Sequence, residues 1–315
     1  MKKALMIILA ALVLTLVGAM YPAPADAGTS LTSTTDLIAT SLQATETGGL
    51  APIMKLPATH YEAGERVLVT SRLAGRSSVD KYPRMALRVD ATGAATVRSP
   101  VISRNHSGSS AGTQYLTVRW LFIAPTAGTY TITARAEATS YYKTTTARLL
   151  VVSGTYLKLS TVNQKSTTWG PASDACVSGK AHPSPDYTAC RTVQKSKDVL
   201  VYNVRTRGYD TITAGSDLEL SCEYGSYPGG TSKVSVTIYA KGINAAGKVC
   251  TPTKSVTKTI SITSLTHHWH DNSTLAGMDV SCAATVALRT RVTYLSGNPV
   301  AIHDKAQSNG FALLS

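Results

Sequence analysis

A run of histidines in the last third of the chain carries the residue types best suited to metal chemistry. His267, His268, Trp269, His270 and Asp271 are consecutive, in a chain that has only seven histidines. In an extended strand, side chains two residues apart lie on the same face, so His268 and His270 present two imidazoles together. Because Zn²⁺ and Cu²⁺ accept imidazole readily, this pair is a predicted metal site.

The histidine pair is incomplete as a metal site, because the sequence does not identify a third ligand. His303 and His182 are candidates only because they are available. The alternative interpretation is a solvated polar loop before Ala276 and Gly277. We therefore expect no cofactor, with Zn²⁺ or Cu²⁺ as the alternative.

Tyrosines form the second group with binding chemistry. The chain has fifteen Tyr but only two Phe and three Trp. Tyr141, Tyr142, Tyr224 and Tyr227 are predicted to form aromatic platforms on which sugar rings stack. The alternative is that these tyrosines occupy strands at sheet edges, since tyrosine is common in strands.

Two motifs resemble catalytic loops but lack the surroundings that the chemistry needs. Residues 108–112 fit the G-x-S-x-G pattern, but that motif requires a helix after Ser110, and an alternating strand pattern follows instead. Residues 242–248 nearly match a phosphate-binding loop, but Val249 stands where Ser or Thr must bind the metal. We predict that the protein is not an enzyme, with a secreted hydrolase as a lesser alternative.

All five cysteines lie in the second half of the chain, and an exported protein would form disulfides from them. Cys176 and Cys190 enclose a proline-containing loop and are predicted to pair. Cys222 and Cys282 both alternate with apolar residues, so both should point into a core. An immunoglobulin-like sandwich would place them in opposite sheets. We predict the disulfide Cys222–Cys282, which leaves the fate of Cys250 open.

The first 27 residues predict a secretory signal peptide. Residues 2–3 are both lysine, residues 4–20 are apolar, and residues 25–27 fit a small-x-small cleavage site. The two-lysine start resembles bacterial signals. The alternative is a membrane anchor, because the apolar stretch is at the lower edge of spanning length. We expect cleavage after Ala27, a secreted extracellular protein and no membrane span after cleavage.

Alternating apolar and polar residues are the main pattern of the mature chain, and this pattern predicts strands. The alternating segments are residues 66–73, 84–90, 115–123, 130–134 and 147–152. Short strands about ten residues apart, with turn residues between them, are typical of a β-sandwich. The fold class is therefore predicted as all-β.

The second half of the chain repeats the first weakly. Three pairs of segments match in the same order: residues 63–71 with 214–222, 85–89 with 234–238, and 106–112 with 270–277. The matches predict an internal duplication. The alternative is that unrelated strands and turns use similar residue types. We expect two tandem immunoglobulin-like β-sandwich domains after the signal peptide of residues 1–27: an N-terminal domain of residues 28–154 and a C-terminal, disulfide-containing domain of residues 155–315.

The net charge of +13, from 31 Lys and Arg against 18 Asp and Glu, favours an anionic environment. The basic residues form no continuous block, which argues against a specific nucleic-acid partner. We predict an exported, non-catalytic β-sandwich protein. It should bind an anionic or glycan partner, such as a cell-wall polymer, a polysaccharide or a surface protein, at or outside the bacterial cell surface. The alternative is an exported metal-binding protein that uses His268 and His270.

Overall fold

The computed structural model describes residues 30–44, 49–78, 83–106, 109–139, 148–181, 188–222, 230–263 and 268–315. The regular elements in these ranges are strands and two short 3-10 turns, η1 (Ser109–Ala111) and η2 (Thr188–Cys190). The prediction of an all-β protein is confirmed. The predicted signal peptide, residues 1–27, lies outside the described residues. Within the described ranges, no helix has the length and apolar character needed to cross a membrane.

The strands of residues 30–161 form two sheets. The first sheet has the order β1 (Ser30–Thr34), β12 (Tyr156–Thr161), β5 (Arg66–Ser77), β11 (Arg148–Val151) and β2 (Ser41–Gln43), and β9 (Thr113–Ile123) also pairs with β5. The second sheet has the order β3 (Ala51–Lys55), β10 (Gly128–Thr139), β6 (Arg84–Gly93) and β7 (Val97–Arg98), with β4 (Thr59–Tyr61) on β10 and β8 (Ile102–Asn105) on β6. Alternate residues such as Val67 and Val69 of β5 share one buried cluster with Leu87 and Val89 of β6, so the core lies between the sheets.

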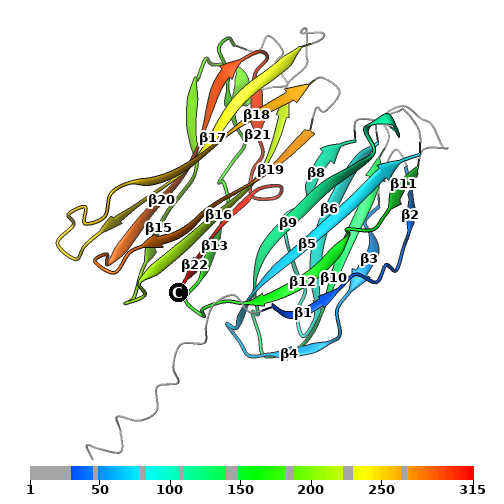
Figure 1. Cartoon of the computed structure of the whole chain (residues 1–315), viewed down its shortest axis with the longest axis horizontal. Helices are drawn as coiled ribbons and strands as arrows, with labels where there is room; N and C mark the ends of the chain where they lie inside the picture. Colours follow the sequence, from blue (N-terminus) through cyan, green and yellow to red (C-terminus); the bar gives the residue numbers. More distant parts are fainter. Residues whose placement is uncertain are drawn as a thin grey trace, which may run out of the picture.

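The strands of residues 167–314 form two further sheets. One has the order β13 (Thr167–Trp169), β22 (Asn309–Leu314), β16 (Thr211–Cys222), β21 (Val300–Ile302) and β14 (Ala175–Val177), and β19 (His268–Asp279) also pairs with β16. The other has the order β15 (Ser196–Arg205), β20 (Thr285–Ser296), β17 (Thr231–Ile243) and β18 (Lys254–Thr263). Leu218 and Leu220 of β16 pack in one buried cluster with Val236 of β17, so these two sheets also enclose a core. Figure 1 shows the two strand-rich halves side by side.

The strand order of the second half repeats that of the first. β5 pairs with β12, β11 and β9, and β16 pairs with the corresponding strands β22, β21 and β19. The residues that are equivalent by strand pairing are not the residues that the sequence matches align. Strand pairing makes Arg72 equivalent to Asp217, whereas the matches align Ser71 with Cys222. Similar strand and turn residues recur at several offsets, so short matches could not fix the register.

The break between the two pairs of sheets falls after the predicted boundary at residue 154. β12, which begins at Tyr156, pairs with β1 and β5 and so belongs with the first half. The first strand of the second half, β13, begins at Thr167. Gly154 has a φ of 95° and forms the turn between β11 and β12. The predicted boundary therefore falls at a turn within the first half.

One predicted disulfide is present and the other is wrong. Cys176 pairs with Cys190 as predicted, whereas Cys282 pairs with Cys250 and not with Cys222. β16 and β19 run antiparallel, with Thr211 opposite Asp279. Cys222 ends β16, so it lies about 11 residues, or roughly 35 Å, from the turn that carries Cys282. Cys222 points into the core as predicted, whereas Cys282 is exposed in the turn after β19, at the opposite end of the sandwich.

The backbone explains why Cys250 takes the place of Cys222. The Cys250 N–H donates to the Gly242 carbonyl at 3.0 Å, and the Ala284 N–H donates to the Ile243 carbonyl at 2.9 Å. These bonds bring the turn after β17 against the turn after β19, which places Cys250 beside Cys282. Cys222 is buried, with its Sγ 3.0 Å from the hydroxyl of Ser232.

Peptide mapping of the oxidised protein under non-reducing conditions should recover a Cys250–Cys282 peptide and a Cys176–Cys190 peptide. The double change Cys250→Ala and Cys282→Ala should lower the free energy of unfolding by about 2–5 kcal/mol, as loss of a native disulfide does in small secreted domains. Cys222→Ala should leave both disulfide peptides in the map. Recovery of Cys222 linked to either Cys250 or Cys282 would contradict the pairing.

Candidate functional site

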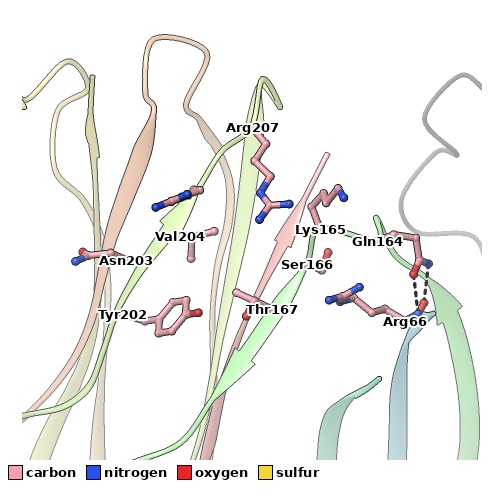
Figure 2. Close-up of a pocket in the computed structure, with 10 residues that line it drawn as sticks. Arg66, Gln164, Lys165, Ser166, Thr167, Tyr202, Asn203, Val204 and Arg207 are labelled. Atoms are coloured by element: carbon pink, nitrogen blue, oxygen red, sulfur yellow. Dashed lines mark hydrogen bonds between the residues drawn. The ribbon is translucent and has the colours of Figure 1, made fainter. Parts of the chain in front are cut away.

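A pocket of about 370 Å³ lies where the two halves meet, and cationic side chains dominate its lining (Figure 2). Arg66 comes from the start of β5, Lys165 from the linker between β12 and β13, Arg205 from the end of β15, and Arg207 from the turn that follows. None of the ten described residues that line the pocket carries a carboxylate, an imidazole or a thiol. Four cations therefore converge on one hollow without an acidic counterpart in its lining.

The linker that carries Lys165 is held in place by hydrogen bonds. The Arg66 N–H donates to the side-chain oxygen of Gln164 at 2.8 Å, and the Gln164 amide donates back to the Arg66 carbonyl at 3.2 Å (Figure 2). Asn163 accepts the Lys165 N–H with its side chain at 2.9 Å and the Ser166 N–H with its carbonyl at 2.9 Å. This turn, of the kind that asparagine favours, fixes the linker against β5.

An aromatic pair lies beside the cations. The rings of Tyr202 and Trp169 stack with their centroids 4.8 Å apart and an angle of 8° between their planes. Tyr202 lines the pocket and is 38% exposed, while Trp169 packs against the core. The pocket thus combines a supported, partly exposed aromatic ring with positive charge.

Arg207 occupies a turn position that arginine rarely takes. Its φ is 54°, that of Gly208 is 84°, and the Tyr209 N–H donates to the Thr206 carbonyl at 3.1 Å. Positive φ at both central residues is the signature of a type I′ turn, in which asparagine and glycine are preferred. A residue with a Cβ in the left-handed region costs roughly 1–2 kcal/mol. The backbone conformation of this turn would favour asparagine or glycine at position 207, so it does not account for the arginine.

An adjoining depression adds acidic residues outside the basic pocket. It shares Arg66, Gln164 and Lys165 with the pocket and also includes Glu62 and Glu65. The Glu65 carboxylate accepts the Glu62 N–H at 2.8 Å, and the Glu62 carboxylate lies 3.4 Å from the ring of His60. The Glu65 carboxylate thus has a hydrogen-bond donor within its own loop, and the Glu62 carboxylate lies beside β4.

The sequence singled out neither the cations of this pocket nor its aromatic pair. The lining comes from separate segments, and the spacing Arg205-Thr206-Arg207 before a glycine is the only local signal. The four tyrosines predicted as sugar platforms are Tyr141, Tyr142, Tyr224 and Tyr227, and all of them lie outside the described residues. Their role stays a prediction.

The two predicted metal-binding histidines lie in β19, on a face that the first half covers. Ser221 lies opposite His268 and Glu219 opposite His270 across the pairing of β16 with β19, so the two imidazoles share a face. Both histidines are buried. The interpretation of this segment as a solvated loop is therefore wrong for the described residues from His268 onward. Metal binding by the pair stays a prediction.

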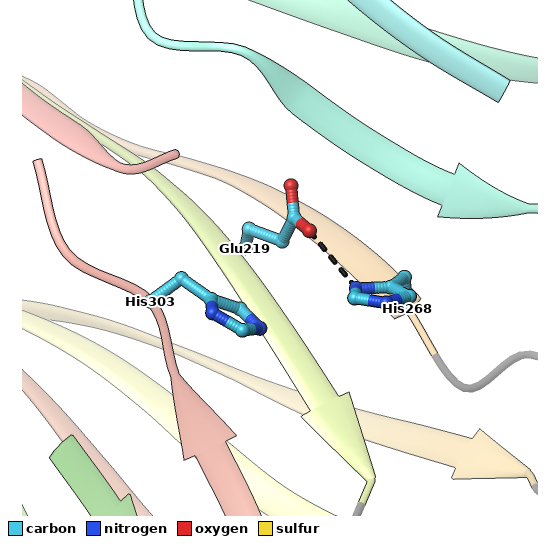
Figure 3. Close-up of side chains that lie close together, drawn as sticks. All are labelled: Glu219, His268 and His303. Carbon is cyan, nitrogen blue, oxygen red and sulfur yellow. Dashed lines mark hydrogen bonds and ion pairs between the residues drawn. The ribbon is translucent and has the colours of Figure 1, made fainter. Parts of the chain in front are cut away.

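Glu219 is the buried charge around which part of this face is organised (Figure 3). Its carboxylate accepts the N–H and the hydroxyl of Ser103 at 2.7 and 2.6 Å, and it lies 2.9 Å from Nδ1 of His268. Burial alone would raise the pKa of Glu219, but the hydrogen bonds from His268 and Ser103 hold the pKa below its usual value. Because Ser103 belongs to β8, this ionised carboxylate links the two halves.

His303 joins this cluster, whereas His270 does not. His303 follows β21, and its ring centroid lies 5.7 Å from that of His268. His270 is two residues from His268, roughly 6–7 Å along the strand. Its buried Nε2 has no hydrogen-bond partner among the described residues. Burial lowers the pKa of His270 below its ordinary value, so the ring is neutral at pH 7.

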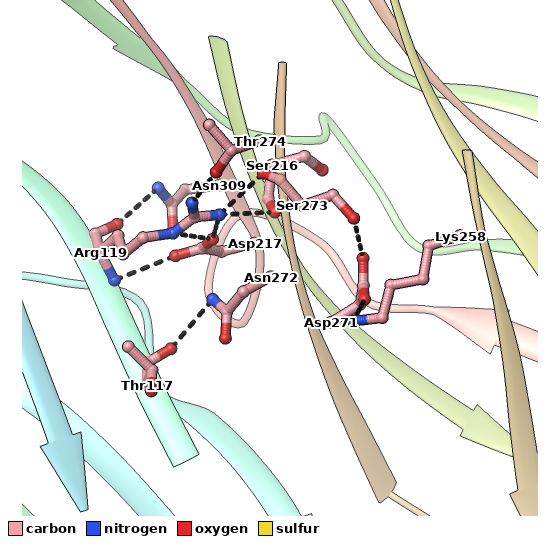
Figure 4. Close-up of polar contacts among 10 residues, drawn as sticks. All are labelled: Thr117, Arg119, Ser216, Asp217, Lys258, Asp271, Asn272, Ser273, Thr274 and Asn309. Carbon is pink, nitrogen blue, oxygen red and sulfur yellow. Dashed lines mark hydrogen bonds and ion pairs between the residues drawn. The ribbon is translucent and has the colours of Figure 1, made fainter. Parts of the chain in front are cut away.

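Arg119 makes the most extensive polar contact between the halves (Figure 4). Its backbone N–H and its Nε donate to the two carboxylate oxygens of Asp217 at 3.0 and 2.8 Å. The guanidinium also donates to the carbonyls of Ser216 and Ser273 at 3.1 and 2.9 Å, and Asn309 donates to the Arg119 carbonyl at 3.2 Å. Asp217 is fully buried, so this pair is desolvated by contact between the halves.

Small apolar contacts surround the polar ones. Leu121 of β9 and Phe311 of β22 belong to a buried cluster between the halves. A Cβ at position 215 would lie 2.0 Å from the Phe311 ring, so Gly215 is needed for the ring to lie flat on β16. An apolar Leu121 on the outward face of a strand was the available sequence signal that this face is covered.

Arg119→Ala should lower the free energy of unfolding by about 3–5 kcal/mol, because it leaves Asp217 buried without its charge partner. Denaturant unfolding, followed by tryptophan fluorescence, measures the change. The matched control is Arg72→Ala, which removes an arginine whose guanidinium lies 3.8 Å from the ring of the exposed Tyr115 and should cost about 1 kcal/mol or less. Equal losses in the two variants would show that the Arg119–Asp217 pair does not hold the halves together.

Comparison with known proteins assigns no family. No protein-family model matches the chain, and no curated protein matches it either. Three solved structures illustrate the similarity that exists. They are the tandem CBM22-1–CBM22-2 domains of Paenibacillus barcinonensis Xyn10C (9% identity, 93% of this chain and 99% of that one, TM-score 0.25), the PBSX exported protein XepA (9%, 93% and 90%, 0.19) and the stem and receptor-binding domain of spike protein P1 from bacteriophage PM2 (7%, 94% and 100%, 0.23). At these TM-scores, the similarities carry no argument about function.

Proposed function

We propose that the protein is an exported, non-catalytic binding protein whose basic pocket binds an anionic glycan, such as an acidic polysaccharide or a wall polymer, outside the bacterial cell. The observation that carries this proposal is the lining of the pocket. Arg66, Lys165, Arg205 and Arg207 converge there, and none of the other described lining residues is acidic.

Electrostatics favours an anionic ligand in this pocket. Four like charges around one hollow repel one another, and a bound anion relieves that repulsion. Arginine side chains also offer paired N–H donors that match carboxylate, sulfate and phosphate groups.

The aromatic ring adds a preference for sugars. Tyr202 presents a partly exposed ring that Trp169 supports from behind. Such a ring is an amphipathic surface, apolar on its face and polar at its hydroxyl, which suits the C–H face of a sugar. A sugar that carries an acidic group therefore fits both features of the pocket, whereas a small inorganic anion uses only one.

The chemistry of the pocket supports binding without catalysis. General acid–base catalysis and covalent catalysis need groups such as a carboxylate, an imidazole or an activated nucleophile. The described lining offers none of the first two and no thiol. Its serine and threonine hydroxyls lie beside arginine and lysine, with no base in the lining to activate them.

The proposal of export rests on the predicted signal peptide and on the cysteines. Two disulfides are typical of proteins that mature in an oxidising compartment. The repeated strand order and the paired sheets support the finer assignment of two tandem immunoglobulin-like β-sandwiches, with the pocket formed where they meet.

The direct test is retention of the full secreted chain on immobilised polygalacturonate, with uncharged dextran of similar length as the comparison polymer. We expect retention on polygalacturonate only, and elution by NaCl, because salt screens exposed charges. Arg205→Gln and Lys165→Gln should each weaken binding about tenfold, the value of one hydrogen bond to a charged group.

Lys195→Gln is the matched control for this test. Lys195 is exposed and precedes β15, ten residues from Arg205. The substitution therefore removes the same charge as Arg205→Gln does, but roughly 33 Å from Arg205 and the pocket. Its binding should equal that of the unmodified protein. If Lys195→Gln weakens binding as much as Arg205→Gln does, the attraction depends on net charge and the pocket is not the site.

Arg207→Asn should separate stability from binding. Asparagine tolerates positive φ better than arginine does, so the variant should be more stable by about 1 kcal/mol. It should nevertheless bind polygalacturonate more weakly, because one of the four cations is gone. Thermal unfolding and affinity electrophoresis measure the two effects. A variant that gains stability with unchanged affinity would remove Arg207 from the proposed site.

A further inference from the structure

Three side chains with metal-binding atoms meet on the face of β16 that is turned toward the first half. Glu219, His268 and His303 each offer one ligand atom, and these atoms all lie within 4.8 Å of one another. Figure 3 shows that the three come from different segments: β16, the start of β19 and the residue after β21. The cluster is separate from the basic pocket, since none of its members lines it.

The backbone holds the three residues in fixed positions. β16 pairs with both β19 and β21, and the His303 N–H donates to the Glu219 carbonyl at 3.0 Å. Sites built on paired strands keep their side chains within a narrow range of positions, as a metal site requires.

Further hydrogen bonds orient the Glu219 carboxylate. Ser103 donates its N–H and its hydroxyl to the Glu219 carboxylate at 2.7 and 2.6 Å. Gln307 donates to the same carboxylate at 3.3 Å. Outer contacts of this kind orient the ligands at metal sites.

Two contacts of Glu219, with His268 and with Arg84, must rearrange when a cation binds. Nδ1 of His268 lies 2.9 Å from a Glu219 oxygen, and binding at Nδ1 requires the tautomer that carries its proton on Nε2. The Arg84 guanidinium, 3.7 Å from the carboxylate, opposes a cation. That contact is longer than a hydrogen bond and the Arg84 side chain is partly exposed, so it can turn toward solvent.

The donor set fits zinc. Zn²⁺ takes imidazole nitrogen and carboxylate oxygen at about 2.0–2.2 Å, which places tetrahedral ligand atoms about 3.4 Å apart. The 2.9 Å separation between Nδ1 of His268 and the Glu219 oxygen must therefore lengthen slightly. The wider separations, of up to 4.8 Å, must shorten by as much as about 1.4 Å, which rotation of the half-buried His303 ring can supply. Two imidazoles and one carboxylate leave a fourth position for water.

We infer that Glu219, His268 and His303 bind one Zn²⁺ ion at the boundary between the two halves. The site replaces the His268–His270 pair that the sequence indicates, with His303 and Glu219 in place of His270. Because Ser103 of the first half orients Glu219, bound zinc stabilises the contact between the halves.

Isothermal titration of the EDTA-treated, full secreted chain with ZnCl₂ tests the inference. We expect one site with a Kd in the micromolar range or tighter. His303→Asn should weaken binding at least tenfold, because it removes one of three protein ligands. His60→Asn, which removes an exposed histidine of the first half, should leave the Kd unchanged. Near-ultraviolet circular dichroism checks that both variants remain folded.

His270→Asn distinguishes the two ligand sets. If zinc binding survives in His270→Asn and is lost in His303→Asn, the inferred ligands are supported. If binding is lost only in His270→Asn, or is no tighter than millimolar in the unmodified chain, the inference is overturned. Retention of each variant on polygalacturonate is measured in parallel, so that failure of the zinc site is distinguished from failure of the proposed glycan pocket.

Discussion

The buried pair of Arg119 and Asp217 is the contact on which the arrangement of the two halves depends. Docking the halves removes the Asp217 carboxylate from water, and a desolvated charge is tolerated only where donors meet it closely. Arg119 meets that requirement with its backbone and its guanidinium together. A shift of one half by even a fraction of a strand spacing would leave the carboxylate buried without its donors. The buried charge of Asp217 therefore restricts the orientation of the two halves more than an apolar contact surface would.

The basic pocket and the cluster around Glu219 both depend on how the two halves are oriented. Arg66 belongs to the first half and Arg205 and Arg207 to the second, so the basic pocket exists only when the halves are docked. The linker that carries Gln164 and Lys165 is held against β5, so this wall of the pocket is fixed to the first half. Glu219 likewise depends on Ser103 from across the boundary. One interface thus builds both the proposed glycan pocket and the inferred zinc site.

Charge is used differently at these two places. In the interface, each buried carboxylate has donors within hydrogen-bond distance, so charge fixes geometry. In the pocket, the cations of Arg66, Lys165, Arg205 and Arg207 have no acidic partner in the described lining, so charge is available to a ligand. The strained backbone of Arg207 fits this division, because residues kept in unfavourable conformations concentrate at functional sites.

The sequence by itself determined the fold class and the position of several strands. Alternation predicted strands at residues 66–73 and 84–90, where β5 and β6 lie, and the loop between Cys176 and Cys190 led to the correct pairing, because both are local properties of the chain. Tertiary structure decided the rest. Alternation shows neither where a strand ends nor which end of the sandwich a cysteine occupies, so Cys222 of the core was wrongly paired with Cys282, which lies exposed in a turn. Alternation also predicted that His268 and His270 share a face, but only the tertiary structure shows that Glu219 and His303 lie beside His268. The pocket cations lie far apart in the chain, and only the docking of two sandwiches through a desolvated ion pair brings them together.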